Sequence, residues 1–128
     1  MIDFHNHILP NIDDGSKSMA MSIEMLENAL SQGITDVVNT VHFQHPKLEN
    51  MDISYPRIKK EIDILQKELY NRNIPIKIHI GSEVFYFPNL LKITDDPLST
   101  IGNGKYMLIE FHPHHIPESH RQQLFDLK

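Results

Sequence analysis

Short apolar runs alternate with segments of helical spacing along this chain, and that alternation limits the folds that it can adopt. Four of the runs have the length and composition of strands. We predict strands over Ile2–Ile8, Ile34–Val41, Pro75–Glu83 and Lys105–Phe111. Strand and helix follow one another four times, and this order is typical of parallel sheets with right-handed crossovers. The sequence therefore predicts an α/β fold built on a parallel sheet.

The helical segments carry their own start and stop signals. Met19–Gln32 has apolar side chains at helical spacing, with Ser18 as a candidate N-cap and Gly33 as a candidate C′ residue. Ser54 is expected to cap a second helix, whose apolar face consists of Ile58, Ile62, Leu65 and Leu69, with Pro56 in the first turn. We expect a last helix to begin at Pro117 and to run to Lys128.

The length of the chain leaves two architectures open. A closed barrel of strands and helices needs about 250 residues, so the 128 residues here correspond to roughly half of one. One expectation is the first half of such a barrel, truncated, because no glycine or proline stop signal follows the last helix. The alternative is a small open α/β sheet that is complete. In both cases residues 1–128 form a single domain.

Composition excludes several classes of function. The chain has no cysteine, which excludes disulfides, zinc–thiolate sites and cysteine nucleophiles. A formal charge of −5 with only three arginines argues against binding to nucleic acid. No apolar run reaches 18 residues, so we expect no membrane insertion. The lack of cysteine fits a cytoplasmic location. The unusual count is nine histidines, which indicates either metal or phosphate chemistry or a chance surface excess.

Each predicted strand carries a histidine or a glutamate at its C-terminal end, which is where parallel α/β folds bind ligands. His5 and His7 lie two residues apart on the first strand, so they share a face at a separation of roughly 6.5 Å. His42 directly follows the second strand, Glu83 ends the third, and Glu110 lies at the end of the fourth. Any one of these could be an ordinary strand-end residue, but four matched ends together predict a metal site.

The ligand types narrow the choice of metal. Imidazoles and carboxylates without thiolates suit Mn²⁺, Fe²⁺ or Zn²⁺. A bridging carboxylate would favour a dinuclear or trinuclear cluster, which activates water and binds phosphoryl oxygens.

The remaining acidic residues and histidines have less specific signals. Asp13 is expected to form a turn with Gly15, whereas Asp14 could either belong to the turn or reach the metal from the loop. His79 lies inside a strand, where a packed and hydrogen-bonded histidine is the better interpretation. The other histidines are expected in loops or on the surface, namely His45, His112, His114, His115 and His120.

The opening "IDFHNHILPNIDDGSK" closely resembles that of the metal-dependent tyrosine-protein phosphatases of bacterial capsule and exopolysaccharide operons. These enzymes belong to the polymerase-and-histidinol-phosphatase (PHP) superfamily. The resemblance continues through "MSIEMLENALSQGITDVVNTVH", "GSEVFY" and "GNGKYMLIEF", so it spans nearly the whole chain. It implies the N-terminal half of a distorted TIM-like barrel that holds a Mn²⁺-type cluster.

The resemblance also implies roles. It marks His5, His7, His42, Glu83 and Glu110 as metal ligands, with Glu83 as the bridge. It further implies hydrolysis of phosphotyrosine by metal-activated water, typically on the tyrosine-rich tail of the autokinase that controls polysaccharide chain length. The partner expected from the resemblance is therefore a phosphotyrosine protein of polysaccharide biosynthesis.

Two departures from the family pattern are visible. Thr40-Val41-His42 stands where the family usually has Thr-Pro-His, which keeps the histidine and loses the stiff proline. The family also continues with a further histidine, an Asp-x-His pair and phosphate-holding arginines, none of which follows here, and this favours truncation. The alternatives are an inactive or metal-binding fragment, another PHP phosphoesterase such as a histidinol-phosphate phosphatase, and an amidohydrolase, which also opens with His-x-His.

Overall fold

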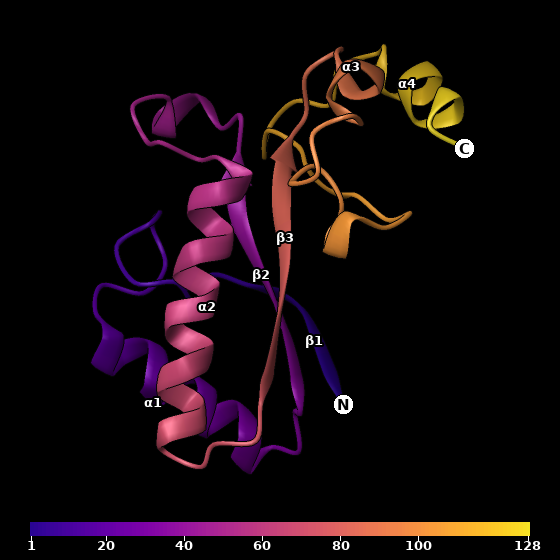
Figure 1. The fold of residues 1–128 in the computed structure, drawn as a ribbon. Coiled ribbons are helices and arrows are strands. Elements are labelled where there is room, and N and C mark those ends of the chain that lie inside the picture. The colour runs from indigo at the N-terminus through magenta and orange to yellow at the C-terminus, as the bar shows by residue number, and fades with distance from the viewer.

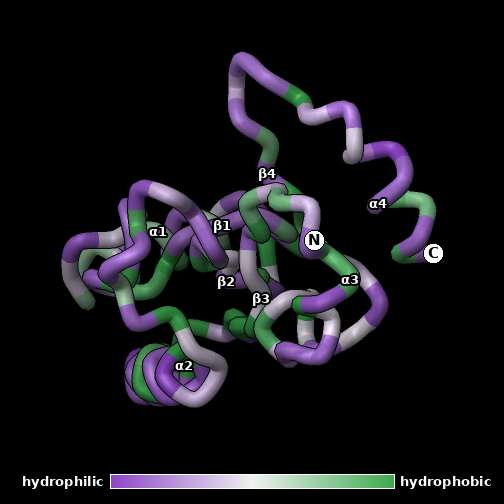
Figure 2. Tube along the Cα trace, turned by 90° about the horizontal axis from the view of Figure 1, so that it is seen from above, coloured by the Kyte–Doolittle hydropathy of each residue, from purple (hydrophilic) through white to green (hydrophobic).

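The computed structural model describes residues 1–128 as a four-stranded parallel sheet with strand order β1-β2-β3-β4. Figure 1 shows the first three strands, and Figure 2 also labels β4. The strands are β1 (Ile2–Asn6), β2 (Asp36–Phe43), β3 (Lys77–Phe85) and β4 (Leu108–Glu110). Together with the intervening helices they form a curled half of a barrel. The predicted α/β fold with parallel strands is therefore confirmed.

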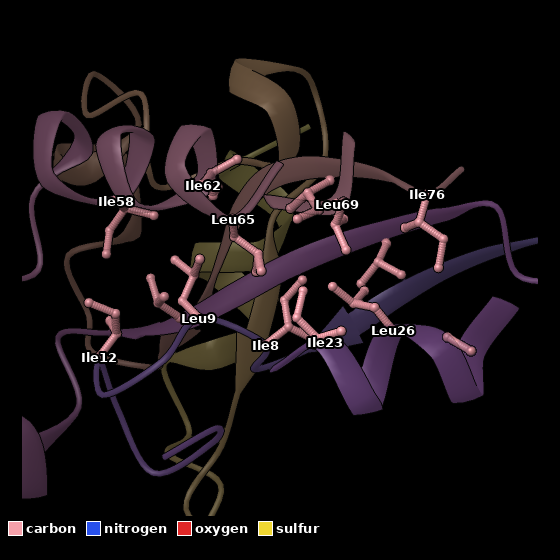
Figure 3. Packing of buried hydrophobic residues seen from close by; sticks show 14 of the residues in the cluster. Ile8, Leu9, Ile12, Ile23, Leu26, Ile58, Ile62, Leu65, Leu69 and Ile76 are labelled. Carbon is pink, nitrogen blue, oxygen red and sulfur yellow. The ribbon is translucent and has the colours of Figure 1, made fainter. Parts of the chain in front are cut away.

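Two long helices bury the apolar side of β2 and β3. Helix α1 (Met19–Ser31) and helix α2 (Tyr55–Asn71) lie on the same side of the sheet (Figures 1 and 2). Their buried side chains come from one stripe on each helix, because residues three or four positions apart share a helix face. Figure 3 shows this packing, in which Leu26 of α1 and Leu65 and Leu69 of α2 are completely buried.

The predicted helix ends are mostly as observed. The Oγ of Ser18 accepts a hydrogen bond of 3.1 Å from the backbone N–H of Met21, so Ser18 caps α1. Gly33 follows this helix with a φ of 81°, a conformation that favours glycine. Ser54 occupies the N-cap position of α2, but its side chain makes no capping hydrogen bond.

The region between β3 and β4 has little regular helix. It contains only the short helix α3 (Leu90–Ile93) and a 3₁₀ turn, η2 (Ile101–Asn103). Prolines and glycines recur through this segment and prevent a longer helix, namely Pro88, Pro97, Gly102 and Gly104. The final helix α4 (His120–Asp126) begins three residues after the predicted Pro117, and another 3₁₀ turn, η1 (Pro46–Leu48), follows β2.

The observed strand boundaries differ from the predicted ones by a few residues, and this changes where the candidate ligands lie on the strands. Strands β2 and β3 each begin and end two residues later than predicted, so His42 and Glu83 lie inside paired strands and face each other in the register. Strand β1 ends at Asn6, after a register irregularity, and His7 lies just beyond it. The parallel register therefore brings the C-terminal parts of the strands into contact.

A second, smaller apolar cluster holds the last part of the chain. Val84, Tyr86 and Leu90 are buried there, with Phe111 and Leu124 packed against them. The hydroxyl of Tyr86 lies 2.9 Å from the Oγ of Ser119, just before α4. No helix of the structure has the length and apolar character needed to span a bilayer.

Candidate metal centre

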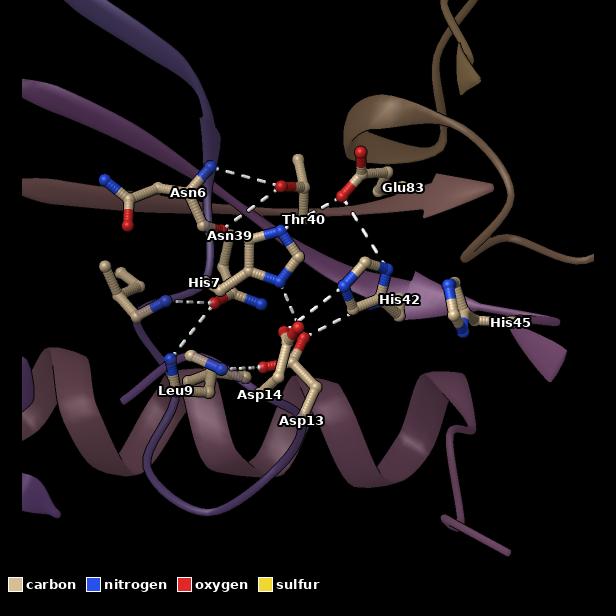
Figure 4. Close-up of polar contacts among 12 residues, drawn as sticks. Asn6, His7, Leu9, Asp13, Asp14, Asn39, Thr40, His42, His45 and Glu83 are labelled. Carbon is tan, nitrogen blue, oxygen red and sulfur yellow. Dashed lines mark hydrogen bonds and ion pairs between the residues drawn. The ribbon is translucent and has the colours of Figure 1, made fainter. Parts of the chain in front are cut away.

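Two polar side chains of β2 hold the segment that follows β1. The Oδ1 of Asn39 accepts hydrogen bonds of 3.1 Å from the backbone N–H groups of both Ile8 and Leu9. The hydroxyl of Thr40 bonds both the N–H and the carbonyl oxygen of Asn6, at 3.1 and 3.2 Å. Asn39 and Thr40 are fully buried, so these hydrogen bonds from β2 fix the path of the chain on both sides of His7 (Figure 4).

The first cluster of candidate ligands meets at a single oxygen. The Nε2 atoms of His5 and His7 lie 3.0 and 3.1 Å from the Oε2 of Glu83, and 3.4 Å from each other. These three side chains come from β1, from the residue just after it, and from β3. Their ligand atoms lie close enough to bind one ion together.

Asp13 fixes the orientation of the His7 ring. Its Oδ2 lies 2.7 Å from the Nδ1 of His7 and accepts the backbone N–H of His42 at 3.2 Å. Its Oδ1 accepts the N–H of Gly15 at 3.0 Å, which is the predicted Asp-Gly turn. Since Asp13 can only accept, His7 carries its proton on Nδ1 and presents Nε2 to Glu83.

The electrostatics of this pair follow from its burial and its hydrogen bonds. Burial acts to lower the pKa of His7, but the hydrogen bond to Asp13 and the charges of Asp13, Glu83 and Asp14 outweigh burial and raise it. Burial likewise acts to raise the pKa of Asp13, but the hydrogen bonds from His7, Gly15 and His42 lower it overall. The pocket thus stabilises positive charge at the His7 ring, whether a proton or a cation supplies it.

A second group of candidate ligands forms around His42. Its Nε2 lies 3.2 Å from the Oδ1 of Asp14, whose side chain is 71% exposed and reaches in from the loop. Its Nδ1 lies 3.3 Å from the Oε2 of Glu110 and 3.7 Å from the Oε2 of Glu83. His42 therefore connects the His5–His7–Glu83 group to Glu110 on β4.

His45 joins this side of the site, although the sequence placed it in a loop or on the surface. Its side chain is only 14% exposed, and its Nε2 lies 3.8 Å from the Oε1 of Glu110. The preceding Gln44 has a φ of 50°, and its side-chain amide donates to the carbonyl oxygen of Phe85 at 2.8 Å. This turn folds His45 back over the site, and no residue pattern in the sequence signals a left-handed glutamine.

Two observations show that these residues fit a bound cation. The Nδ1 of His42 and the Oε2 of Glu110 are buried without any hydrogen-bond partner, because their mutual contact lacks hydrogen-bond geometry. Four carboxylates and four imidazoles gather here, and each ion pair that these carboxylates make is with a histidine. A divalent cation would bind the unpaired nitrogen and oxygen atoms and would balance the negative charge of the carboxylates.

The structure thus brings together all six side chains that the sequence singled out as candidate metal ligands, namely His5, His7, Asp14, His42, Glu83 and Glu110. It adds His45 beside them and gives Asp13 a role beyond its turn. The signal for the supporting residues was the polar pair Asn39-Thr40 inside an otherwise apolar strand.

The other histidines lie apart from this site. The Nε2 of His79 lies 2.8 Å from the Oδ1 of Asp36, so the expectation of a packed, hydrogen-bonded histidine is confirmed. His112, His114 and His115 are exposed, as expected. The Nδ1 of His120 hydrogen-bonds the carbonyl oxygen of Pro117 at 2.7 Å at the start of α4.

Comparison with known proteins relates the whole chain to one family. The sequence profile of the family described as "Capsular polysaccharide synthesis, CpsB/CapC" matches residues 1–127. The tyrosine-protein phosphatase YwqE of Bacillus subtilis (strain 168) is 33% identical over 129 aligned positions, which cover 100% of this chain and 50% of YwqE. The tyrosine-protein phosphatase CpsB of Streptococcus pneumoniae is 30% identical over 115 positions, 89% of this chain and 46% of CpsB.

Solved structures give the same relationship. The chain matches, with a TM-score of 0.88 and 34% identity, a chain from the crystal structures of YwqE from Bacillus subtilis and CpsB from Streptococcus pneumoniae, described as metal-dependent tyrosine phosphatases. The match covers 99% of this chain and 51% of that one, and the chain spans about half the length of the curated relatives that it matches. On the family match and this structural likeness, the chain belongs to the CpsB/CapC family of capsular polysaccharide synthesis.

Proposed function

We propose that residues 1–128 are a single domain of a metal-dependent protein-tyrosine phosphatase and supply part of its metal centre. The proposed ligands are His5, His7, Asp14, His42, Glu83 and Glu110, with Glu83 as the bridge. The observation that carries the proposal is the Oε2 of Glu83, with the Nε2 atoms of His5 and His7 at 3.0 and 3.1 Å and the Nδ1 of His42 at 3.7 Å. One carboxylate oxygen thus faces ligands of two neighbouring groups.

The chemistry of the donor set supports Mn²⁺, with Fe²⁺ or Zn²⁺ as substitutes, in a cluster of two or three ions. Such ions supply water activation and charge compensation for phosphoryl oxygens when bound. The residues of this chain hold that centre in place. Asp13 accepts the hydrogen on Nδ1 of His7 and so directs Nε2 toward Glu83, where it would ligate the metal, and Asn39 fixes the backbone beyond His7.

The substrate follows from the relatives, which are named tyrosine-protein phosphatases of a capsular polysaccharide synthesis family. We propose that the substrate is phosphotyrosine on a tyrosine autokinase of polysaccharide biosynthesis. Because the chain spans about half of these relatives, turnover by this chain alone is part of what the experiment decides.

The test is hydrolysis of a phosphotyrosine peptide by this chain, with and without Mn²⁺, beside the double variant His5→Ala/His7→Ala. Calorimetry of Mn²⁺ binding to both proteins accompanies the assay. We expect Mn²⁺ to bind the native chain and to bind the variant at least tenfold more weakly, because the variant lacks two of the proposed ligands. Activity that requires both Mn²⁺ and the histidines would support the phosphatase proposal for the chain as it stands. Tight Mn²⁺ binding without any hydrolysis would leave a metal-binding unit, and absence of Mn²⁺ binding would overturn the assignment of the site.

A further inference from the structure

The first strand carries one extra residue just before the candidate metal centre. On β1 the pairing advances by three residues, from Asp3 to Asn6. On β2 it advances by only two residues, from Val37 to Asn39. Two consecutive residues of β1 therefore oppose a single residue of β2, which defines a β-bulge. The second of these two residues is His5, so the bulge lies directly at a proposed ligand.

The bulge decides on which face of the sheet His5 lies. Val37 belongs to the core under the helices, so its partner Asp3 lies on the helix side of the sheet. Regular alternation would place His5, two residues later, on that same side. Instead, the Nε2 of His5 lies 3.0 Å from Glu83, which pairs with His42 on the opposite face. The extra residue therefore turns His5 toward the other candidate ligands.

The side chain of Asp3 closes this bulge. Its Oδ1 accepts the backbone N–H of His5 at 3.1 Å, and its Oδ2 accepts the side-chain Nδ2 of Asn6 at 2.8 Å. Both carboxylate oxygens are thus bound to the two residues that complete the bulge. Asp3 belongs to none of the three groups whose ligand atoms converge, so its contacts are with the chain and not with the metal position.

His5 depends on its backbone more than its neighbour His7 does. The side chain of His5 is 50% exposed, and its ring has polar contacts only at Nε2, with His7 and Glu83. The ring of His7 is 18% exposed and is held from behind by Asp13 at Nδ1. No such partner holds the ring of His5, so the conformation of the bulge determines where its Nε2 lies.

We infer that Asp3 is a positioning residue for the metal centre, which acts through His5. The inference rests on the proposed function and adds to it a residue that does not touch the ion. By closing the bulge, the Asp3 carboxylate holds the His5 backbone in the conformation that directs Nε2 at Glu83. Bulges beside functional sites commonly aim a side chain in this way.

The experiment measures Mn²⁺ affinity by calorimetry in the native chain, Asp3→Ala and Asp3→Asn. We expect Asp3→Ala to bind Mn²⁺ about tenfold more weakly, a loss typical of residues that orient a ligand. Asp3→Asn should stay within about threefold of the native chain, because an amide oxygen still accepts the N–H of His5 and the Asn6 amide can turn over to accept the new N–H group. Both variants lose the same charge, so their difference reports geometry.

A second comparison shows whether Asp3 acts through His5. In a His5→Ala background, Asp3→Ala should change the Mn²⁺ affinity by less than about twofold, because the ligand that Asp3 positions is already absent. A general loss of stability would weaken binding equally in both backgrounds. Circular dichroism confirms that each variant is folded. If Asp3→Ala does not fold, Asn6→Ala replaces it, since it removes one of the two hydrogen bonds that close the bulge.

The possible outcomes are distinct. Native affinity in folded Asp3→Ala overturns the inference and leaves the metal centre standing. An equal loss in Asp3→Asn and Asp3→Ala overturns it in favour of a charge effect, and a tenfold loss that persists in the His5→Ala background overturns it in favour of a structural role. If the native chain does not bind Mn²⁺, the proposed metal centre fails and the inference fails with it.

Discussion

At the scale of single residues, the two nitrogens of the His7 ring meet different carboxylates with different tasks. Asp13 contacts Nδ1 at 2.7 Å and is 6% exposed, whereas Glu83 faces Nε2 at 3.1 Å. Carboxylates that orient a ligating imidazole contribute to metal affinity without touching the ion.

Replacing Asp13 should therefore weaken metal binding although Asp13 is not a proposed ligand. We expect Asp13→Asn to lower the affinity for Mn²⁺ by about 10- to 100-fold, because its amide no longer fixes the His7 tautomer. Asp36→Asn is the matched control, since Asp36 also pairs with a histidine, His79, at 2.8 Å but away from the site. Calorimetry on both variants decides, and equal affinities for the two would contradict the orienting role.

The Asp36–His79 pair should make the free energy of unfolding depend on pH. Hydrogen bonds from His79 and Thr35 lower the pKa of Asp36, with a smaller contribution from the charge of Lys77. A carboxyl whose pKa is lower in the folded state stabilises the fold above its unfolded pKa of about 3.9 and loses this contribution as the pH falls through the folded value. The free energy of unfolding should therefore fall less steeply from pH 5 to pH 2 in Asp36→Asn than in the native chain. Urea unfolding followed by circular dichroism at each pH tests this, and an unchanged slope would refute it.

At this scale the sequence predicted candidate ligands at strand ends, because the C-terminal ends of parallel strands lie at one edge of a sheet. It could not identify His45, whose place depends on the left-handed turn at Gln44 and on a hydrogen bond to Phe85. It also treated Asp13 as a turn residue, since the contact with His7 arises only after the loop has closed.

At the scale of elements, the two long helices differ in how they begin. The side chain of Ser18 caps α1 through the N–H of Met21, whereas Ser54 precedes α2 without a capping hydrogen bond. Ser18→Ala should lower the free energy of unfolding by about 1 kcal/mol, and Ser54→Ala should lower it by less than half as much. Chemical denaturation of both variants checks the difference, and equal losses would show that the Ser18 bond contributes nothing.

The loop after β1 depends on Gly15 for a different reason. A Cβ on Gly15 would lie 2.2 Å from the carbonyl oxygen of His7, so the loop must move away from the proposed ligand His7 to accept a side chain. Gly33 has open space around it but a φ of 81°, so alanine there costs roughly 1–2 kcal/mol of backbone strain. We expect both Gly15→Ala and Gly33→Ala to lower stability, and only Gly15→Ala to reduce affinity for Mn²⁺. Native affinity in a folded Gly15→Ala protein would contradict this prediction.

Helices α1 and α2 and the first three strands were predictable because periodicity, caps and β-branched runs agree over those segments. The exact short helical turns of the segment from Pro88 to Gly104 were not, because repeated prolines and glycines leave them to be decided by packing against β3. The three-residue β4 is shorter than its apolar run for the same reason: only the part opposite Glu83–Phe85 finds a partner.

At the scale of the whole molecule, the sheet has two edges, β1 and β4, that lack a neighbour on one side. The side chains of Ile2 and Phe4 on β1 are 50% and 55% exposed. Unpaired strand edges with apolar side chains favour association between chains. We expect the chain to associate at high concentration and Phe4→Lys to reduce that association, while Tyr70→Lys on the surface of α2 leaves it unchanged. Light scattering across a concentration series measures this, and identical behaviour of the native chain and Phe4→Lys would contradict it.

The architecture as a whole was only partly predictable from the sequence pattern and the chain length. The order of strands and helices predicted a parallel sheet, but pattern left a half-barrel and a complete open sheet both available. The curl of the four strands, which distinguishes them, is a property of the whole sheet and is not encoded in any short motif.

The sequential strand order also governs how the site comes into being as the chain folds. Each strand pairs only with its neighbour in sequence, so the sheet can be assembled in the order in which a ribosome delivers it. The proposed ligands are distributed over β1, the following loop, β2, β3 and β4, so an early folding intermediate holds only part of the set. A cation that needs the whole set binds the finished sheet and not its precursors, and its binding free energy therefore adds to the cooperativity of folding.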